Sequence, residues 1–183
     1  TLDQYDFTNK FLNTHNYSDS TSQNNFLISS KIVHKKNISI IGKGSLAGID
    51  LQRFDLEKTL PQATSKMKNL NLDLDKFTFL FVGRKVKDKG IEELVQAFKI
   101  FQKDTDSQGQ LLLVGPFESG DPISEKTHSD INDDLLITDL GFQDRPEDFM
   151  AIADVFCLPS YREGFGTVVL EAASLGTPSI GTN

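Results

Sequence analysis

The chain has 183 residues, 38% of them hydrophobic, which is enough for one domain with a sizeable core. Its formal net charge of -7 argues against a nucleic-acid-binding protein, whose surface would carry a basic patch. No apolar run approaches the roughly 20 residues of a membrane-spanning helix, and the N-terminus lacks the basic and apolar regions of a signal peptide. The single cysteine, Cys157, has no partner for an internal disulfide. Together these features predict a cytoplasmic location.

The N-terminal residues 1–25 are rich in Asn, Ser, Thr, Asp and Gln, and their few aromatic residues follow no clear period. We expect a loosely structured lead-in here. The chain starts with Thr1 rather than methionine and ends at Asn183, just after a strand-like segment, as an excised fragment would.

A plausible strand at 38–41 is followed by a glycine-rich stretch at 42–50. Gly42, Gly44 and Ala47 match the dinucleotide-binding pattern G-x-G-x-x-G/A. No convincing crossover helix follows, however, and Gln62 stands about where an acidic ribose-binding residue is needed. We therefore reject a dinucleotide-binding motif in this stretch.

From Phe77 onward, apolar runs typical of buried strands alternate with helical patterns. Strands are predicted at 77–82, 111–114, 135–137, 155–158 and 178–181, and helices at 91–101, near 122–129, at 148–153 and at 167–175. This alternation predicts right-handed crossovers and an α/β, Rossmann-like parallel sheet that is flanked by helices. Ligands of such sheets bind beyond the carboxyl ends of the strands.

The last thirty residues hold the most informative pattern, in which a strand and a glycine-bearing turn lead into a helix. The turn Gly164-Phe165-Gly166 and the helix start offer unpaired backbone N–H groups and a positive dipole end, which suit a phosphate. Glu163 and Glu171 lie eight residues apart, so they can hold two different hydroxyl-bearing parts of one ligand.

Metal-binding patterns are weak. Asp73-Leu74-Asp75 and Asp104-Thr105-Asp106 resemble a metal-holding Asp-x-Asp, but the first precedes its strand and the second lies in a polar loop. The three histidines are far apart and lack ligand spacing. We expect no metal.

The stretch PSYREGFGTVVLEAASLGTP, with its two glutamates, resembles the signature of the retaining glycosyltransferases of family 4, which have the GT-B architecture. GKGSLAGIDLQRF is similar to the junction between their two domains, particularly in enzymes that build bacterial surface polysaccharides. The resemblance covers most of the chain from about Ile38 to Asn183. It implies a remnant of the acceptor domain at 1–45, an interdomain junction at 46–70, and at 71–183 the C-terminal, donor-binding half of a GT-B enzyme, truncated at its end.

The resemblance also implies roles for single residues. Arg84 and Lys89 would neutralise the donor diphosphate, with Lys85 and Lys87 as partly solvated neighbours, and Glu163 would bind hydroxyls of the donor sugar. Glu171 would accept hydrogen bonds from the ribose, unless it is an ordinary carboxylate on a helix face. The remaining donor-binding residues would be Gly83, Gly115, Phe142, Gln143, Gly164, Phe165, Gly166 and Thr167. Phe142 is equally compatible with a place in the core.

The implied activity is transfer of a sugar from a nucleoside diphosphate sugar to an acceptor hydroxyl, with retention and without a cofactor or metal. A UDP-sugar is favoured on frequency alone. The acceptor, a glycan or a lipid-linked saccharide, would bind through the missing N-terminal domain, so this chain alone should catalyse little. Such a role in capsule or surface polysaccharide synthesis allows peripheral membrane association of the full-length protein. A GT-B nucleotide-sugar epimerase, a non-catalytic nucleotide-binding module and an NAD-binding oxidoreductase are the alternatives.

Overall fold

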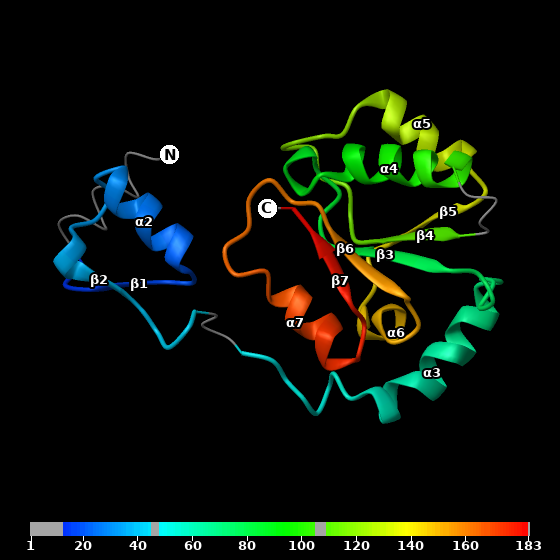
Figure 1. Ribbon diagram of the computed structural model, residues 1–183, viewed down its shortest axis with the longest axis horizontal. Coiled ribbons are helices and arrows are strands. Elements are labelled where there is room, and N and C mark those ends of the chain that lie inside the picture. The colour runs from blue at the N-terminus through cyan, green and yellow to red at the C-terminus, as the bar shows by residue number, and fades with distance from the viewer. Residues whose placement is uncertain (1–12, 45–47, 105–108, 183) are drawn as a thin grey trace. The chain divides into compact units, whose positions relative to one another are not determined.

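The computed structural model describes residues 13–44, 48–104 and 109–182. The chain divides into two compact bodies (Figure 1). The first body contains the described residues up to Gly48 together with Glu163–Thr167. The second contains Ile49–Arg162 and Val168–Asn183, so far as these are described.

The first body contains a small β-α-β unit. Strand β1 (Asn16–Ser18) pairs in parallel with β2 (Ile38–Ile40), and helix α2 (Thr21–Ser29) connects them. The Ser20 side chain caps α2 by accepting a hydrogen bond from the backbone N–H of Gln23 at 3.1 Å.

The prediction of a loose lead-in is therefore wrong for residues 13–25, and residues 1–12 lie outside the described part. The partner that orders β1 is β2, about twenty residues further along the chain. The periodicity of neighbouring residues does not reveal a pairing between strands so far apart in the sequence.

The second body is built on a five-stranded parallel sheet with the order β5-β4-β3-β6-β7. Its strands are β3 (Thr78–Val82), β4 (Gln110–Val114), β5 (Ile137–Gly141), β6 (Val155–Leu158) and β7 (Ser179–Gly181). Strand β3 is central, and the chain moves outward from it first toward β5 and later toward β7. The predicted parallel α/β sheet is thereby confirmed.

Helices cover both faces of this sheet. They are α3 (Leu56–Asn69), α4 (Ile91–Asp104), α5 (Glu125–Asp133), α6 (Glu147–Met150) and α7 (Thr167–Ser174). Helices α4 and α5 lie on one face, and α6 and α7 lie on the other, as right-handed crossovers require when the strand order reverses at β3 (Figure 1). Helix α3, which follows an Asp55 cap, occupies much of the predicted junction and was not predicted as a helix.

Successive residues of the buried strands supply two separate cores. In β4, Leu111 and Leu113 pack toward α4 and α5, while Leu112 and Val114 pack toward α6 and α7. All four are buried, which explains why β4 is an unbroken apolar run.

The strand predicted at 135–137 begins later than expected. The Asp134 carboxylate accepts a hydrogen bond from the N–H of Leu136 at 2.9 Å, which holds residues 134–136 in a turn. Leu135 is consequently 97% exposed, and β5 starts at Ile137.

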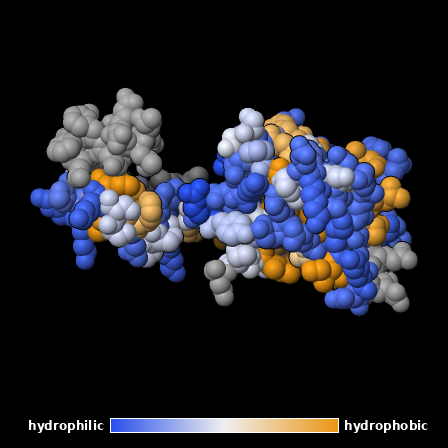
Figure 2. Space-filling model, turned by 90° about the horizontal axis from the view of Figure 1, so that it is seen from above, coloured by the Kyte–Doolittle hydropathy of each residue, from blue (hydrophilic) through white to orange (hydrophobic). Residues whose placement is uncertain are grey.

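Seen from the side of α4 and α5, the surface of the second body is mostly hydrophilic (Figure 2). Within the described residues, no helix is both long enough and apolar enough to cross a bilayer.

Candidate functional site

The carboxyl ends of β3, β4 and β5 meet in a close backbone contact made by three glycines. The N–H of Gly83 donates to the carbonyl of Val114 at 2.9 Å, and the N–H of Gly115 donates to the carbonyl of Gly141 at 2.7 Å. A Cβ atom on Gly115 would lie 1.9 Å from the Gly83 carbonyl oxygen. Only glycine permits this approach, so Gly83 and Gly115, both predicted site residues, lie together at this edge.

The loop after β3 is fastened to the first part of the loop after β6. The N–H of Tyr161 donates to the Asp88 carbonyl at 3.0 Å, and the Arg162 guanidinium binds the Asp88 carboxylate at 3.0 Å. Gly90 approaches Pro159 so closely that a Cβ atom would lie 2.1 Å from its carbonyl oxygen. Both loops therefore lie at the same edge of the sheet, as expected for neighbouring parallel strands.

Arg84 follows Gly83 directly, and its side chain is 58% exposed. Its Nη1 donates a hydrogen bond to Oε2 of Glu118 at 2.8 Å. Lys89 ends a short 3-10 turn, Lys87–Lys89, and is half-buried. The structure thus places both predicted cations in the loop between β3 and α4.

Lys85 is not partly solvated as predicted, whereas its neighbour Lys87 is exposed. The Lys85 side chain is completely buried, forms an ion pair with Asp139 of β5 and places its ammonium 4.0 Å from the ring centroid of Phe117. Burial lowers the pKa of Lys85, and the Asp139 carboxylate opposes that shift. The buried lysine holds the ends of β3, β4 and β5 together.

Phe142 and Gln143 follow β5 at the same edge. Phe142 is 71% exposed, so the core position that the sequence left open is wrong. The side-chain amide of Gln143 donates to the carbonyl of Leu140 at 2.8 Å. An exposed aromatic ring beside strand ends is available to stack on a flat ligand.

Glu171 lies on α7 and is half-buried. Its pKa is raised mainly by burial and further by the negative charge of Glu147, while the positive charge of Arg53 lowers it. Arg53 in turn donates two hydrogen bonds to the fully buried Glu147, at 3.1 and 2.9 Å. This charged group was missed because Arg53 and Glu147 lie 94 residues apart in the sequence.

The loop Glu163–Thr167 belongs to the first body. Glu163 is exposed, Gly166 has a φ of +70°, and Thr167 is the first residue of α7. The Phe165 ring lies against Gly44, where an added Cβ atom would be 2.9 Å from the ring. Gly164 lies near Asp19, whose carboxylate would be 3.8 Å from a Cβ atom at that position.

The two Asp-x-Asp sequences have no metal-binding geometry in the described residues. Asp73 pairs with Lys76, and its carbonyl accepts a hydrogen bond from Gln110. Asp104 ends α4, and residues 105–106 lie outside the described part. Among the residues that the structure describes, no cluster of three or more His, Cys, Asp or Glu side chains could hold a metal ion.

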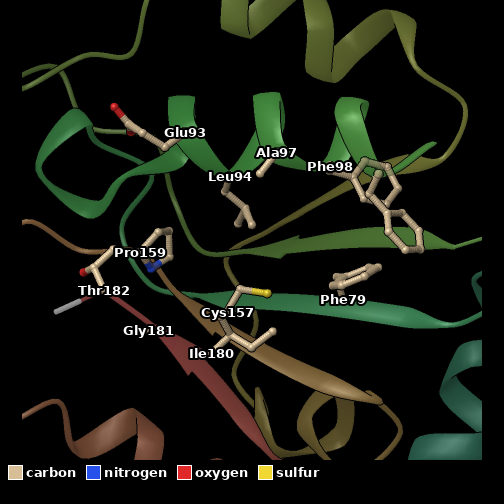
Figure 3. A pocket seen from close by; sticks show the side chains of 11 residues that line it. Phe79, Glu93, Leu94, Ala97, Phe98, Cys157, Pro159, Ile180, Gly181 and Thr182 are labelled. Carbon is tan, nitrogen blue, oxygen red and sulfur yellow. The ribbon is translucent and has the colours of Figure 1, made fainter. Parts of the chain in front are cut away.

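A separate, almost entirely apolar pocket of about 280 Å³ lies between α4 and the strands β6 and β7. Figure 3 shows Cys157 and Ile180 facing Leu94, Ala97 and Phe98 across it. The pocket contains none of the predicted site residues.

The Cys157 thiol should react slowly with thiol-specific reagents at neutral pH. It is buried, and burial raises its pKa to about 11, so the reactive thiolate is scarce. We expect labelling in the folded protein to accelerate as pH rises toward that value. Labelling in urea is the control, and because the chain has one cysteine the signal reports Cys157 alone. Equal rates in the folded and unfolded chain would contradict the buried position.

The sequence of this chain matches a known protein family. The family model of glycosyl transferases group 1 matches residues 62–183. The chain therefore belongs to the group 1 glycosyltransferases, as the glutamate-bearing signature predicted.

Two relatives show how much of the chain is shared. It is 34% identical over 168 residues to the capsular polysaccharide biosynthesis glycosyltransferase CapM of Staphylococcus aureus, covering 90% of this chain and 42% of CapM. It is 33% identical over 136 residues to the putative teichuronic acid biosynthesis glycosyltransferase TuaC of Bacillus subtilis, covering 74% of this chain and 32% of TuaC. The chain thus spans less than half the length of these relatives.

Solved structures share the fold. Anabaena Alr3699/HepE in complex with UDP and glucose superimposes with a TM-score of 0.78 at 21% identity, covering 98% of this chain and 47% of that chain. WaaG, a glycosyltransferase involved in lipopolysaccharide biosynthesis, superimposes with a TM-score of 0.72 at 18% identity, covering 90% and 43%. These matches confirm the predicted GT-B fold.

Proposed function

We propose that this chain is the donor-binding part of a retaining, family 4 glycosyltransferase that takes a sugar from a nucleoside diphosphate sugar. The observation that carries the proposal is the position of Arg84. Its exposed guanidinium follows Gly83 at the carboxyl edge of a parallel sheet, beside the close backbone contact of Gly83 with Gly115. This is where ligands of open α/β sheets bind, and membership in the glycosyltransferase family supplies the ligand class.

Arg84 and Lys89 would hold the donor diphosphate. A guanidinium can bind two phosphate oxygens through its planar fork, and an ammonium adds a point charge. The backbone N–H groups of Gly164, Phe165 and Gly166, with the Thr167 hydroxyl, would complete the anion site at the start of α7. Glu163 would bind hydroxyls of the donor sugar.

The remaining predicted residues would bind the nucleoside. Glu171 would accept hydrogen bonds from the ribose hydroxyls, a role for which its carboxylate must be ionised. Arg53 supports this role because its charge opposes the rise that burial causes in the pKa of Glu171. The exposed ring of Phe142 would stack on the base, and Gln143 would contact the edge of the base.

In the proposed reaction, the bond between the anomeric carbon and the diphosphate oxygen breaks, and its electron pair stays on the diphosphate. The acceptor hydroxyl attacks from the same face, so the configuration is retained, and the leaving phosphate takes the acceptor proton. Arg84, Lys89 and the amides at the start of α7 stabilise the charge that develops on the leaving group. No step in this scheme requires a metal.

The comparisons favour particular substrates. Two neighbouring Anabaena Alr3699/HepE structures hold UDP, or UDP and glucose, which supports a UDP-sugar donor. One relative, 29% identical over 137 residues and from Escherichia coli, is a UDP-Gal:alpha-D-GlcNAc-diphosphoundecaprenol alpha-1,3-galactosyltransferase. With CapM, it supports a saccharide acceptor in polysaccharide biosynthesis. We propose that the protein acts in the cytoplasm. Acceptor binding would use parts of the enzyme beyond this chain, so we propose that the chain alone binds nucleotide but transfers little.

Titration of this chain with nucleotides tests the proposal. We expect UDP to bind more tightly than uridine. Arg84→Ala should weaken UDP about ten- to hundredfold, because it removes charge-assisted hydrogen bonds to the diphosphate, and should leave uridine unchanged. Glu171→Ala should weaken both ligands, because both contain the ribose.

The matched control is Lys126→Ala, which removes an exposed positive charge from α5. GDP and ADP, tested beside UDP, identify the base. The proposal fails if none of these nucleotides binds, or if Arg84→Ala and Lys126→Ala have equal effects.

A further inference from the structure

Glu118 makes a contact that the proposed roles do not explain. Its carboxylate accepts a hydrogen bond from Arg84, the residue that we assign to the donor diphosphate, at 2.8 Å. The side chains of Arg84 and Glu118 are 58% and 40% exposed. An incoming diphosphate would therefore meet an arginine that already has an anionic partner.

The backbone places Glu118 two residues beyond Pro116, which is the residue opposite Arg84. Beyond the end of the β3–β4 pairing, the N–H of Lys85 donates to the Pro116 carbonyl at 2.8 Å, and Lys85 forms a parallel bridge with Phe117. The two segments therefore run side by side for several residues past the strands.

Successive side chains of this extension face opposite ways. Lys85 points inward and is buried over the Phe117 ring, in an ion pair with Asp139. Arg84 is exposed, and there it meets Glu118. Because the buried Lys85 holds the two backbone segments together, Glu118 stays within reach of the Arg84 guanidinium.

We propose that Glu118 is a positioning residue that promotes release of the nucleoside diphosphate product, which rests on the diphosphate role assigned to Arg84 above. Glu118 holds Arg84 when no ligand is bound, and the diphosphate must exchange with it. After transfer, the carboxylate competes again for the guanidinium and repels the product.

The repulsion differs between substrate and product. In a nucleoside diphosphate sugar, each phosphate is esterified and carries one charge. In the free diphosphate, the terminal phosphate has a second ionisation with a pKa of about 6, so it bears an additional negative charge near neutral pH. A fixed carboxylate beside Arg84 therefore disfavours the product more strongly than the donor.

The test measures the affinities of UDP, UDP-glucose and uridine for wild-type protein and for Glu118→Gln, which removes the charge and keeps the shape. We expect Glu118→Gln to tighten UDP by about three- to fivefold, which is the size of one surface charge pair. UDP-glucose should tighten less, and uridine should not change. The gain should shrink between about 0.02 M and about 0.5 M salt, because salt screens exposed charges.

Three further variants make the result specific. Glu118→Asp keeps the charge and should preserve the wild-type order of affinities. Glu57→Gln removes one exposed negative charge from α3 and should change no affinity. In an Arg84→Ala background the competition for the guanidinium is gone and only the repulsion between the carboxylate and the diphosphate remains, so Glu118→Gln should tighten UDP less than it does beside Arg84.

The outcomes separate this inference from the proposed function. If wild-type protein binds UDP but Glu118→Gln weakens it, or affects UDP and UDP-glucose equally, the product-release role is wrong while nucleotide binding stands. If wild-type protein binds neither UDP nor UDP-glucose, the proposed function fails and this inference fails with it.

Discussion

Gly115→Ala should destabilise the second body by about 2–5 kcal/mol, the sum expected for a forced overlap and a left-handed backbone. The added Cβ atom would lie 1.9 Å from the Gly83 carbonyl oxygen, and Gly115 has a φ of +129°. The obstacle is backbone, so no side-chain movement relieves it. Urea unfolding followed by circular dichroism measures the loss.

Two other glycines separate the causes of that loss. Gly141 has a φ of +61° but nothing within 4 Å of an added Cβ atom, so Gly141→Ala should cost only the conformational strain, about 1–2 kcal/mol. Gly120 has neither a positive φ nor a close neighbour, and Gly120→Ala should shift stability by about 0.5 kcal/mol or less. If Gly115→Ala unfolds at the same urea concentration as Gly120→Ala, the close contact of strand ends does not exist.

Arg53→Met should destabilise the second body by about 2–4 kcal/mol, because it leaves the buried Glu147 carboxylate without its main partner. Glu147 is 1% exposed and receives two hydrogen bonds from Arg53. Arg145 also contacts this carboxylate, at 3.5 Å, and the Arg53 side chain is 44% exposed, so the loss falls below that of a fully buried pair.

A double-mutant cycle shows whether the unpaired charge is responsible. Glu147→Gln removes the charge, so the double variant Arg53→Met with Glu147→Gln should be more stable than Arg53→Met alone. Arg84→Met is the exposed comparison, since the Arg84–Glu118 pair lies in solvent and should contribute about 0–1 kcal/mol. Equal losses for Arg53→Met and Arg84→Met would show that the Glu147 carboxylate is not buried as described.

The sequence allowed some residues of the candidate site to be proposed, but not the contacts of others. Arg84, Phe142 and Glu171 could be proposed as site residues because each stands directly after a strand or on the helix that follows one, and strand ends of a parallel sheet share an edge. Lys85 and Glu118 were not assigned their contacts. The exposed Arg84 and the buried Lys85 are adjacent in the sequence. Only the pairing of the two segments past β3 and β4 decides which of the two side chains faces inward.

The parallel α/β class, the amphipathic face of α4 and the membership in the group 1 glycosyltransferases could be inferred from the sequence, because these depend on patterns within one element or one short loop. The pairing of β1 with β2 and the burial of Glu147 against Arg53 could not be inferred in this way. A buried charge or an edge strand is stable only with its partner, and these partners lie up to 94 residues away in the chain.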